Sequence, residues 1–253
     1  MRNQKRIGIM GALPEEIDYI LPLIENKTEV RLGKRTFYCG TIHQQEVVVV
    51  FSRIGKVAAA ATVSTLILHF AVSEVIFTGV AGGIDSKVKI GDIVIANQLV
   101  QHDMNAEPLM PRHEIPLLGK TFFEADQKLL NCSEKAAQKV LNQKIFSDQE
   151  IEEFKLHLPT VHVGLIGSGD LFFSTNQKKA QLNQRLSAIL CVEMEGAAVA
   201  QVCYEFGVPC VVIRSISDDA DEHSSVNFMR FIQHIGRAYS KGIVEEIIRA
   251  RKL

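Results

Sequence analysis

Short runs of valine and isoleucine alternate along this chain with longer stretches in which apolar residues recur at helical spacing. An unbroken apolar run is typical of a strand buried on both faces, and its alternation with helices indicates an α/β sheet. The predicted strands are Arg6–Met10, Glu46–Phe51, Glu74–Thr78, Asp92–Ala96, Val161–Ile166, Ala188–Val192 and Cys210–Ile216. The predicted helices are Val57–His69, Ala125–Leu141, Ala197–Phe206 and Phe228–Arg251.

Small and acidic residues follow these predicted strands. In open α/β sheets, ligands bind at the edge where the carboxyl ends of the strands meet. The sequence therefore predicts a ligand site built from the segments after the strands. These segments are Gly11–Glu16, Ser52–Lys56, Gly79–Gly83, Gly167–Asp170, Glu193–Gly196 and Ser217–Asp219.

Length, net charge and cysteine content indicate the number of domains and the kinds of partner that this chain can bind. With 253 residues, no repeat and no linker, the chain is expected to form one domain over residues 1–253. A net charge of -1 provides no field that would attract nucleic acid or an anionic membrane. The five cysteines show no C-x-x-C spacing, and no apolar stretch of about 18 residues or secretion signal occurs. We therefore expect a cytoplasmic protein that binds neither nucleic acid nor membrane.

Glu16 and the Gly79–Gly83 stretch each allow two interpretations. A glutamate in the first turn of a helix that begins near Pro14 interacts favourably with the helix dipole and needs no catalytic role. The glycines either cradle a ligand through backbone N–H groups or form a tight turn after a strand.

The acids at the two later strand ends are equally ambiguous when each is considered alone. Glu193 and Glu195 point to one side of a strand end, so they are either exposed or engaged with donors. Ser217 and Asp218 have the residue types of a helix N-cap and turn, and Arg214 precedes them in the same strand.

Several common chemistries lack their motifs. The chain has no HExxH and no Cys/His spacing of a metal site, so no metal is predicted. Arg6 stands where a dinucleotide fingerprint needs its first glycine, no Walker lysine follows a glycine loop, and no G-x-S-x-G elbow is present. We therefore expect no cofactor and no serine nucleophile, and we interpret His102 and His113 as ordinary loop histidines.

The motifs taken jointly are more specific than any one of them. In order along the chain, the motifs are Gly8–Ala12 with Glu16, Ile54–Ala59, Thr78–Gly83, Gly91–Val94, Ser168–Asp170, Val192–Glu195 and Arg214–Asp218. Over nearly the whole chain, this series resembles that of the 5'-methylthioadenosine/S-adenosylhomocysteine nucleosidases. The resemblance implies a three-layer α/β sandwich with a central mixed, partly barrel-like sheet flanked by helices, active as a homodimer without a cofactor.

The resemblance also implies a role for individual residues. Glu16 would activate water and Asp218 would protonate adenine N7, with Ser217 orienting Asp218 and Arg214 helping to place the water. Glu195 would hold the ribose hydroxyls beside Met194, Phe172 would stack on the base, and the Phe173 backbone would bind its edge. Ile54, Gly82 and Phe228 would line the pocket, and Leu109 or Met110 of a partner subunit would cover the 5' group.

Ordinary acid–base chemistry suits these residue types. Adenine leaves readily only when it is protonated, so one carboxyl must hold a proton near neutral pH while the other is ionised. A free aspartate has a pKa of about 3.9, so Asp218 needs surroundings that raise its pKa.

Three rival functions remain on the same scaffold. A purine nucleoside phosphorylase would need a phosphate-binding arginine where this chain has Phe77. Futalosine hydrolase has acid and base at similar positions, and a non-catalytic nucleoside-binding protein could use the same fold. The loop that contains Leu109 and the presence of Val80 in place of a serine both depart from the family pattern.

Overall fold

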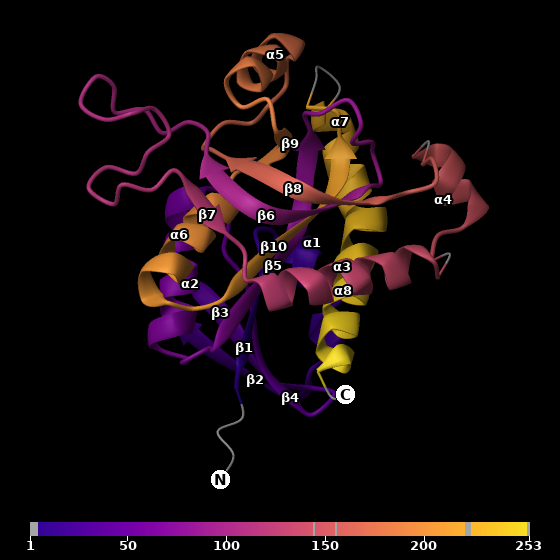
Figure 1. Cartoon of the computed structure of the whole chain (residues 1–253). Coiled ribbons are helices and arrows are strands. Elements are labelled where there is room, and N and C mark those ends of the chain that lie inside the picture. The colour runs from indigo at the N-terminus through magenta and orange to yellow at the C-terminus, as the bar shows by residue number, and fades with distance from the viewer. Residues whose placement is uncertain (1–4, 144, 155, 221–223, 252–253) are drawn as a thin grey trace.

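The computed structural model describes residues 5–143, 145–154, 156–220 and 224–251 (Figure 1). Its strands are β1 (Ile7–Gly11), β2 (Glu25–Leu32), β3 (Arg35–Ile42), β4 (Gln45–Phe51), β5 (Glu74–Gly83), β6 (Ile93–Gln101), β7 (Phe122–Glu124), β8 (Val161–Ser168), β9 (Ile189–Glu193) and β10 (Cys210–Asp218). Its longer helices are α2 (Lys56–Leu68), α3 (Gln127–Leu141), α5 (Asn176–Arg185), α6 (Gly196–Phe206) and α8 (Arg237–Ala250). The shorter ones are α1 (Pro14–Ile17), a 3-10 turn (Leu21–Leu23), α4 (Asp148–Glu153), α7 (Ser224–Phe231) and the π-helical segment η2 (Ile232–Gly236).

The described strands form one mixed sheet that is partly closed on itself. Neighbouring strands follow the order β10, β6, β8, β9, β5, β1, β4, β3, β2, with β7 beside β6. Because β10 also pairs with β5, the first five strands of this order close into a barrel, while the remaining strands extend it as an open sheet. This arrangement confirms the predicted mixed, partly barrel-like sheet.

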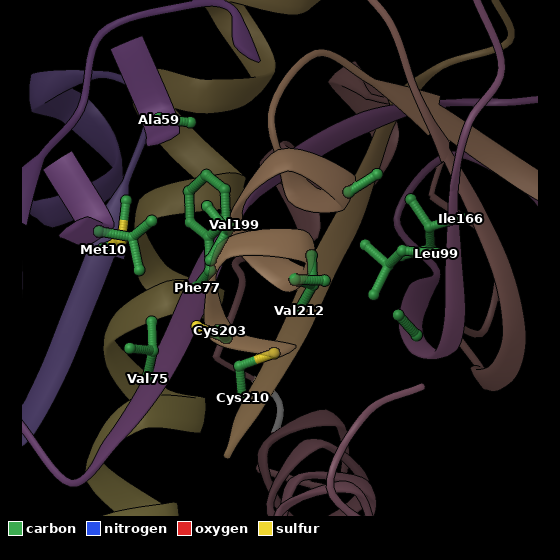
Figure 2. Close-up of a cluster of buried hydrophobic side chains, with 14 of the residues drawn as sticks. Met10, Ala59, Val75, Phe77, Leu99, Ile166, Val199, Cys203, Cys210 and Val212 are labelled. Atoms are coloured by element: carbon green, nitrogen blue, oxygen red, sulfur yellow. The ribbon is translucent and has the colours of Figure 1, made fainter. Parts of the chain in front are cut away.

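Helices cover both faces of the sheet, as the predicted three-layer sandwich requires. The helices α2 and α6 pack together on one face, and α3 and α8 pack together on the other (Figure 1). Alternate residues of a strand enter opposite layers: Val75 and Phe77 pack into the core beneath α2 and α6, whereas Ile76 packs into the core beneath α3 and α8. Figure 2 shows Phe77 beside Val199 of α6.

All the predicted strands exist, but several continue further toward their carboxyl ends. The strand predicted at Glu74–Thr78 runs to Gly83, and the strand predicted at Cys210–Ile216 runs to Asp218. The Gly79–Gly83 stretch is therefore strand and not the predicted turn or loop. In β5 and β10 the register pairs Ser215 with Val80 and Asp218 with Gly82, so ladder hydrogen bonds hold these residues in extended form.

The sequence did not predict the hairpin formed by β2 and β3, nor the helices α4 and α5. The hairpin turns at Gly33, which has a positive φ of 58°, and most of β2 is exposed, so it lacks the apolar run used to predict strands. The single helix predicted at Phe228–Arg251 is instead α7, η2 and α8 in succession. Within the described residues, no helix combines the length and apolarity needed to cross a bilayer.

Candidate active site

A cavity that is open to solvent lies at the carboxyl ends of β1, β5, β9 and β10. Nine of the residues proposed from the sequence line it together. They are Glu16, Ile54, Gly82, Phe172, Phe173, Met194, Glu195, Asp218 and Phe228. Ala12, Leu13, Val80, Ala81, Leu171, Val192 and Glu193 complete the described lining.

Glu16 is held in the cavity by backbone N–H groups. Its Oε2 accepts hydrogen bonds from the N–H groups of Ala12 and Leu13, and its Oε1 accepts one from Val80 at 3.1 Å. The contact with Leu13 is local, because a glutamate in the first turn of a helix commonly accepts a hydrogen bond from the N-cap N–H. The contact with Val80 instead reaches the neighbouring strand β5. Glu16 is therefore a buried residue that joins two strands at the cavity, and not only a helix-dipole partner.

Two opposing effects act on the Glu16 carboxyl. Burial raises its pKa above the ordinary value of 4.5, while the charge of Arg214 and the three backbone hydrogen bonds lower it; the net direction is upward. Gly79 makes room for this group, because a Cβ at that position would lie 2.5 Å from Glu16 Oε1. The Gly79–Gly83 stretch thus serves a carboxylate of the protein itself.

Asp218 is the last residue of β10 and pairs with Gly82 of β5. Its Oδ2 accepts a hydrogen bond from Ser217 Oγ at 2.7 Å, and its Oδ1 accepts one from the Ala220 N–H at 2.9 Å. A Cβ on Gly82 would lie 2.9 Å from Asp218 Oδ1, so the glycine permits the approach. Asp218 is only 3% exposed although it lines the cavity.

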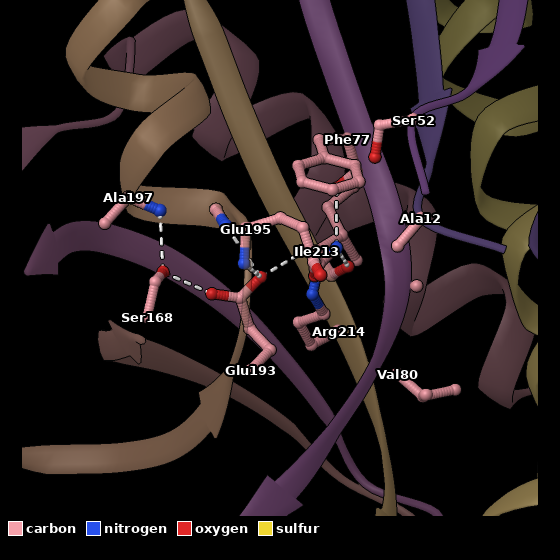
Figure 3. A network of polar contacts seen from close by, with 12 residues as sticks. Ala12, Ser52, Phe77, Val80, Ser168, Glu193, Glu195, Ala197, Ile213 and Arg214 are labelled. Carbon is pink, nitrogen blue, oxygen red and sulfur yellow. Dashed lines mark hydrogen bonds and ion pairs between the residues drawn. The ribbon is translucent and has the colours of Figure 1, made fainter. Parts of the chain in front are cut away.

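Glu193 belongs to a network of polar contacts with Ser168, Arg214 and the start of α6 (Figure 3). Its Oε2 accepts hydrogen bonds from the Gly196 N–H at 2.7 Å and from Arg214 at 2.6 Å, while its Oε1 accepts one from Ser168 Oγ. Ser168 in turn accepts the Ala197 N–H at 2.7 Å. Glu193 and Ser168 therefore cap the N-terminus of α6, and this carboxylate already has its donors.

Glu195 has a different environment from Glu193. Its Oε1 accepts a hydrogen bond from the Gly55 N–H at 2.7 Å, and the side chain is buried at the cavity. Burial and the neighbouring charge of Glu193 raise its pKa above the ordinary value of 4.5, against the lowering effects of Arg214 and Gly55. Of these two acids, Glu195 is the one suited to bind ligand hydroxyls.

Aromatic side chains form one wall of the cavity. Phe172 is 43% exposed and meets Phe228 edge to face, with ring centroids 6.1 Å apart. The ring of Phe173 is buried against His102, and Phe173 also lines the cavity. The exposed ring of Phe172 is suited to stack on a planar ligand.

Three of the proposed residues lie outside the lining. Ser217 Oγ donates a hydrogen bond to Asp218, and its predicted role in orienting that side chain stays a prediction. Arg214 is buried over the ring of Phe77, at 4.1 Å from its centroid, and pairs with Glu193, so its predicted place beside a water stays a prediction. Leu109 is 88% exposed and lies outside the cavity of its own chain.

Sequence reasoning gave no role to the N–H groups of Ala12, Leu13 and Val80, nor to Ser168. Backbone donors leave no trace in residue types, although the Ser168–Asp170 motif did contain the serine. Among the described residues, no group of three or more potential ligands could hold a metal ion.

The described lining carries four carboxyl groups and no lysine, arginine or histidine. Such a site can supply a general acid, a general base and acceptors for hydroxyl groups, but it offers no cation to bind an anion. These groups therefore suit acid–base chemistry on a neutral ligand that carries hydroxyl groups.

Comparison with known proteins shows which family this chain belongs to. Residues 6–249 match the phosphorylase superfamily. The chain belongs to this superfamily. Within it, the relatives are nucleosidases: aminodeoxyfutalosine nucleosidase of Helicobacter pylori (strain J99) is 37% identical over 249 residues, which cover 96% of this chain and 100% of the relative. The 5'-methylthioadenosine/S-adenosylhomocysteine nucleosidase of Actinobacillus succinogenes is 36% identical over 228 residues, covering 90% and 91%.

Solved structures of nucleosidases in this superfamily confirm the fold. The futalosine hydrolase of H. pylori strain 26695 matches with a TM-score of 0.84 at 36% identity, covering 99% of this chain and 100% of that chain. The S. pneumoniae 5'-methylthioadenosine/S-adenosylhomocysteine nucleosidase, solved with the transition-state inhibitor MT-ImmA, matches with a TM-score of 0.82 at 31% identity, covering 97% and 99%.

Proposed function

We propose that this nucleosidase hydrolyses the N-glycosidic bond of 5'-methylthioadenosine and S-adenosylhomocysteine, and also that of 5'-deoxyadenosine. The products are adenine and the 5'-substituted ribose, a reaction of methionine salvage and methyl-cycle detoxification. The observation that carries the proposal is the pair Glu16 and Asp218, which line one cavity in different hydrogen-bonding surroundings.

The two acids would act at opposite ends of the breaking bond. Asp218 delivers a proton to adenine N7, so that the base leaves as a neutral molecule. Glu16, held by its three backbone donors, takes a proton from the attacking water. Glu195 accepts hydrogen bonds from the ribose hydroxyls, and the buried negative charge near the sugar stabilises the oxocarbenium-like transition state.

The charge of the site supports water over phosphate as the nucleophile. A phosphorylase must neutralise phosphate with a cation, and the described lining contains none. Arg214 pairs with Glu193 and lies over the ring of Phe77. Phe77 itself stands at the sequence position where a phosphorylase would have its phosphate-binding arginine.

Aminodeoxyfutalosine is the second candidate substrate. The relatives from two H. pylori strains, 37% and 36% identical to this chain, carry the name aminodeoxyfutalosine nucleosidase. The acid, the base and Glu195 would act on either substrate in the same way, so the difference must lie at the 5' side of the site.

The assembly and the location of the enzyme are further parts of the proposal. We expect a homodimer in which Leu109 or Met110 of one subunit covers the 5' group bound by the other, and the exposure of Leu109 supports this role. We expect the protein in the cytoplasm, where these metabolites arise.

Adenine release from 5'-methylthioadenosine, S-adenosylhomocysteine and aminodeoxyfutalosine tests the proposal, in phosphate-free buffer and again with added phosphate. Rapid release from the two thioadenosines without phosphate is the expected result. Release from aminodeoxyfutalosine alone would establish the second candidate, and release that needs phosphate would make the protein a phosphorylase. Binding of the nucleosides without any release would indicate a non-catalytic protein.

A further inference from the structure

Lys56 and Asp103 form an ion pair next to the cavity but outside its lining. Lys56 is the first residue of α2, and its Nζ lies 2.7 Å from Asp103 Oδ1 and 3.1 Å from Gln101 Oε1. Asp103 follows β6, and each of the two side chains is 17% exposed. The pair therefore joins two segments that lie far apart in the sequence, in a place mostly shielded from water.

Asp170 closes these contacts into a ring. The Asp170 N–H donates to Asp103 Oδ2 at 2.9 Å, and Asp170 Oδ1 accepts the Lys56 N–H at 2.9 Å. The hydrogen bonds from Lys56 and Asp170 hold the pKa of Asp103 below its ordinary value of 3.8, although burial acts in the opposite direction. Asp103 is thus an ionised link between the start of α2 and the segment that follows β8.

Each of the linked segments carries one wall of the cavity. Directly before Lys56, Ile54 lines the cavity and the Gly55 N–H binds Glu195. Directly after Asp170, the segment from Leu171 to Phe173 forms the aromatic wall. The close approach of the two segments depends on Gly55, whose φ is 99° and whose added Cβ would lie 3.1 Å from Asp170 Oδ1.

We propose that Lys56 and Asp103 are positioning residues that fix the distance between the ribose wall at Gly55 and Glu195 and the base wall at Leu171–Phe173. This inference rests on the function proposed above. Neither side chain lines the cavity, so the pair acts through the segments it connects. The two walls bind the substrate, whereas Glu16 and Asp218 are held by contacts of their own on β5 and β10. Loss of the pair should therefore weaken binding and leave the chemical step almost unchanged.

The test measures kcat and KM for 5'-methylthioadenosine, the Kd of adenine and the thermal midpoint in four variants: Lys56→Met, Lys56→Arg, Asp103→Asn and the double variant of Lys56→Met with Asp103→Asn. We expect Lys56→Met to raise KM and the adenine Kd about tenfold, with kcat within about twofold of wild type. Asp103→Asn keeps an acceptor and should raise KM about threefold. The double variant should resemble Lys56→Met, because the two side chains act as a unit. Lys56→Arg keeps the positive charge, so it should retain most of the affinity that Lys56→Met loses.

Lys139→Met is the matched control, because Lys139 makes a 2.6 Å pair with Glu246 between α3 and α8, on the opposite face of the sheet. It should leave KM unchanged. A KM within twofold of wild type in Lys56→Met would overturn the inference. So would effects that multiply in the double variant, or a loss confined to kcat. If the wild-type protein releases no adenine, the proposed function fails first and this inference fails with it, whereas active wild type with unaffected variants refutes the positioning role alone.

Discussion

Replacing Glu16 by glutamine removes the proposed base while it changes the shape of the side chain very little. Three backbone N–H groups point at this carboxylate, two at Oε2 and one at Oε1. In the best orientation, the amide keeps its oxygen toward Ala12 and Leu13 and turns its nitrogen toward Val80, so one buried N–H loses its acceptor. That loss costs about 1–3 kcal/mol of folding stability, and the removal of a buried charge offsets part of it.

The catalytic effect of this substitution should be much larger than its structural effect. A general base contributes a factor of about 10² to 10⁴ in rate, so kcat for 5'-methylthioadenosine should fall about 10³-fold, or about 4 kcal/mol of transition-state stabilisation. The thermal midpoint should drop by about 2–10 °C, as the stability cost predicts for a chain of this size. The Kd of adenine should stay within about threefold of wild type, because Glu16 is assigned to contact the attacking water and not adenine.

Single-turnover adenine release and calorimetric binding of adenine measure these effects separately. Glu15→Gln provides the matched control, since Glu15 is the adjacent glutamate of α1 but does not line the cavity. It should leave kcat unchanged. A Glu16→Gln variant that folds, binds adenine and keeps kcat within tenfold of wild type would refute the role of Glu16 as base.

Three further predictions follow from the same contacts. Asp218→Asn should reduce kcat by about 10²-fold or more while nucleoside binding persists, since it removes the proton donor to N7; kinetics and equilibrium binding measured on the same preparation decide this. Gly79→Ala should lower both kcat and the thermal midpoint, because the new Cβ would lie 2.5 Å from Glu16 Oε1, and unchanged kcat would contradict the close approach. Glu195→Gln should alter the pH dependence of stability. The pKa of Glu195 is raised in the folded protein, so its stabilising contribution is complete below about pH 4.5 and is lost as the pH rises through the folded pKa. The thermal midpoint of wild type should therefore decline more than that of Glu195→Gln between about pH 5 and about pH 8, and parallel curves would show that the shift is absent.

The strands and the edge that carries the site could be predicted because they depend on local patterns. An apolar run such as Val47–Val50 has few alternatives to a buried strand, and the acids after such runs must meet at one edge of the sheet. Helices were predicted equally well where apolar spacing was regular, as in α6. The β2–β3 hairpin escaped prediction because its residues are mostly exposed and share no apolar period.

The detailed arrangement of the site depends on backbone atoms and on contacts between distant segments. The glycines of β5 were expected to form a turn or a ligand loop, but their lack of a side chain gives space to Glu16 and Asp218. The roles of Glu193 and Glu195 could not be separated from their spacing, because the difference is set by Arg214 and by the N-terminus of α6. No pattern in one sequence specifies such partners.

The charges around the cavity govern which of its acids can keep a proton near neutral pH. Four carboxyl groups line the cavity, and the guanidinium of Arg214 lies directly against Glu193. The pKa of Arg214 is raised, since burial acts to lower it but the charges of Glu193, Glu16 and Glu195 outweigh that effect. One cation cannot neutralise all the acids, so repulsion and burial favour proton retention on part of them. Burial raises the pKa of Glu16, whereas the charge of Arg214 and the three backbone donors act to lower it and so favour its ionised form. The proposed mechanism requires a division of protonation states, with Glu16 ionised beside the sugar and Asp218 protonated beside the purine.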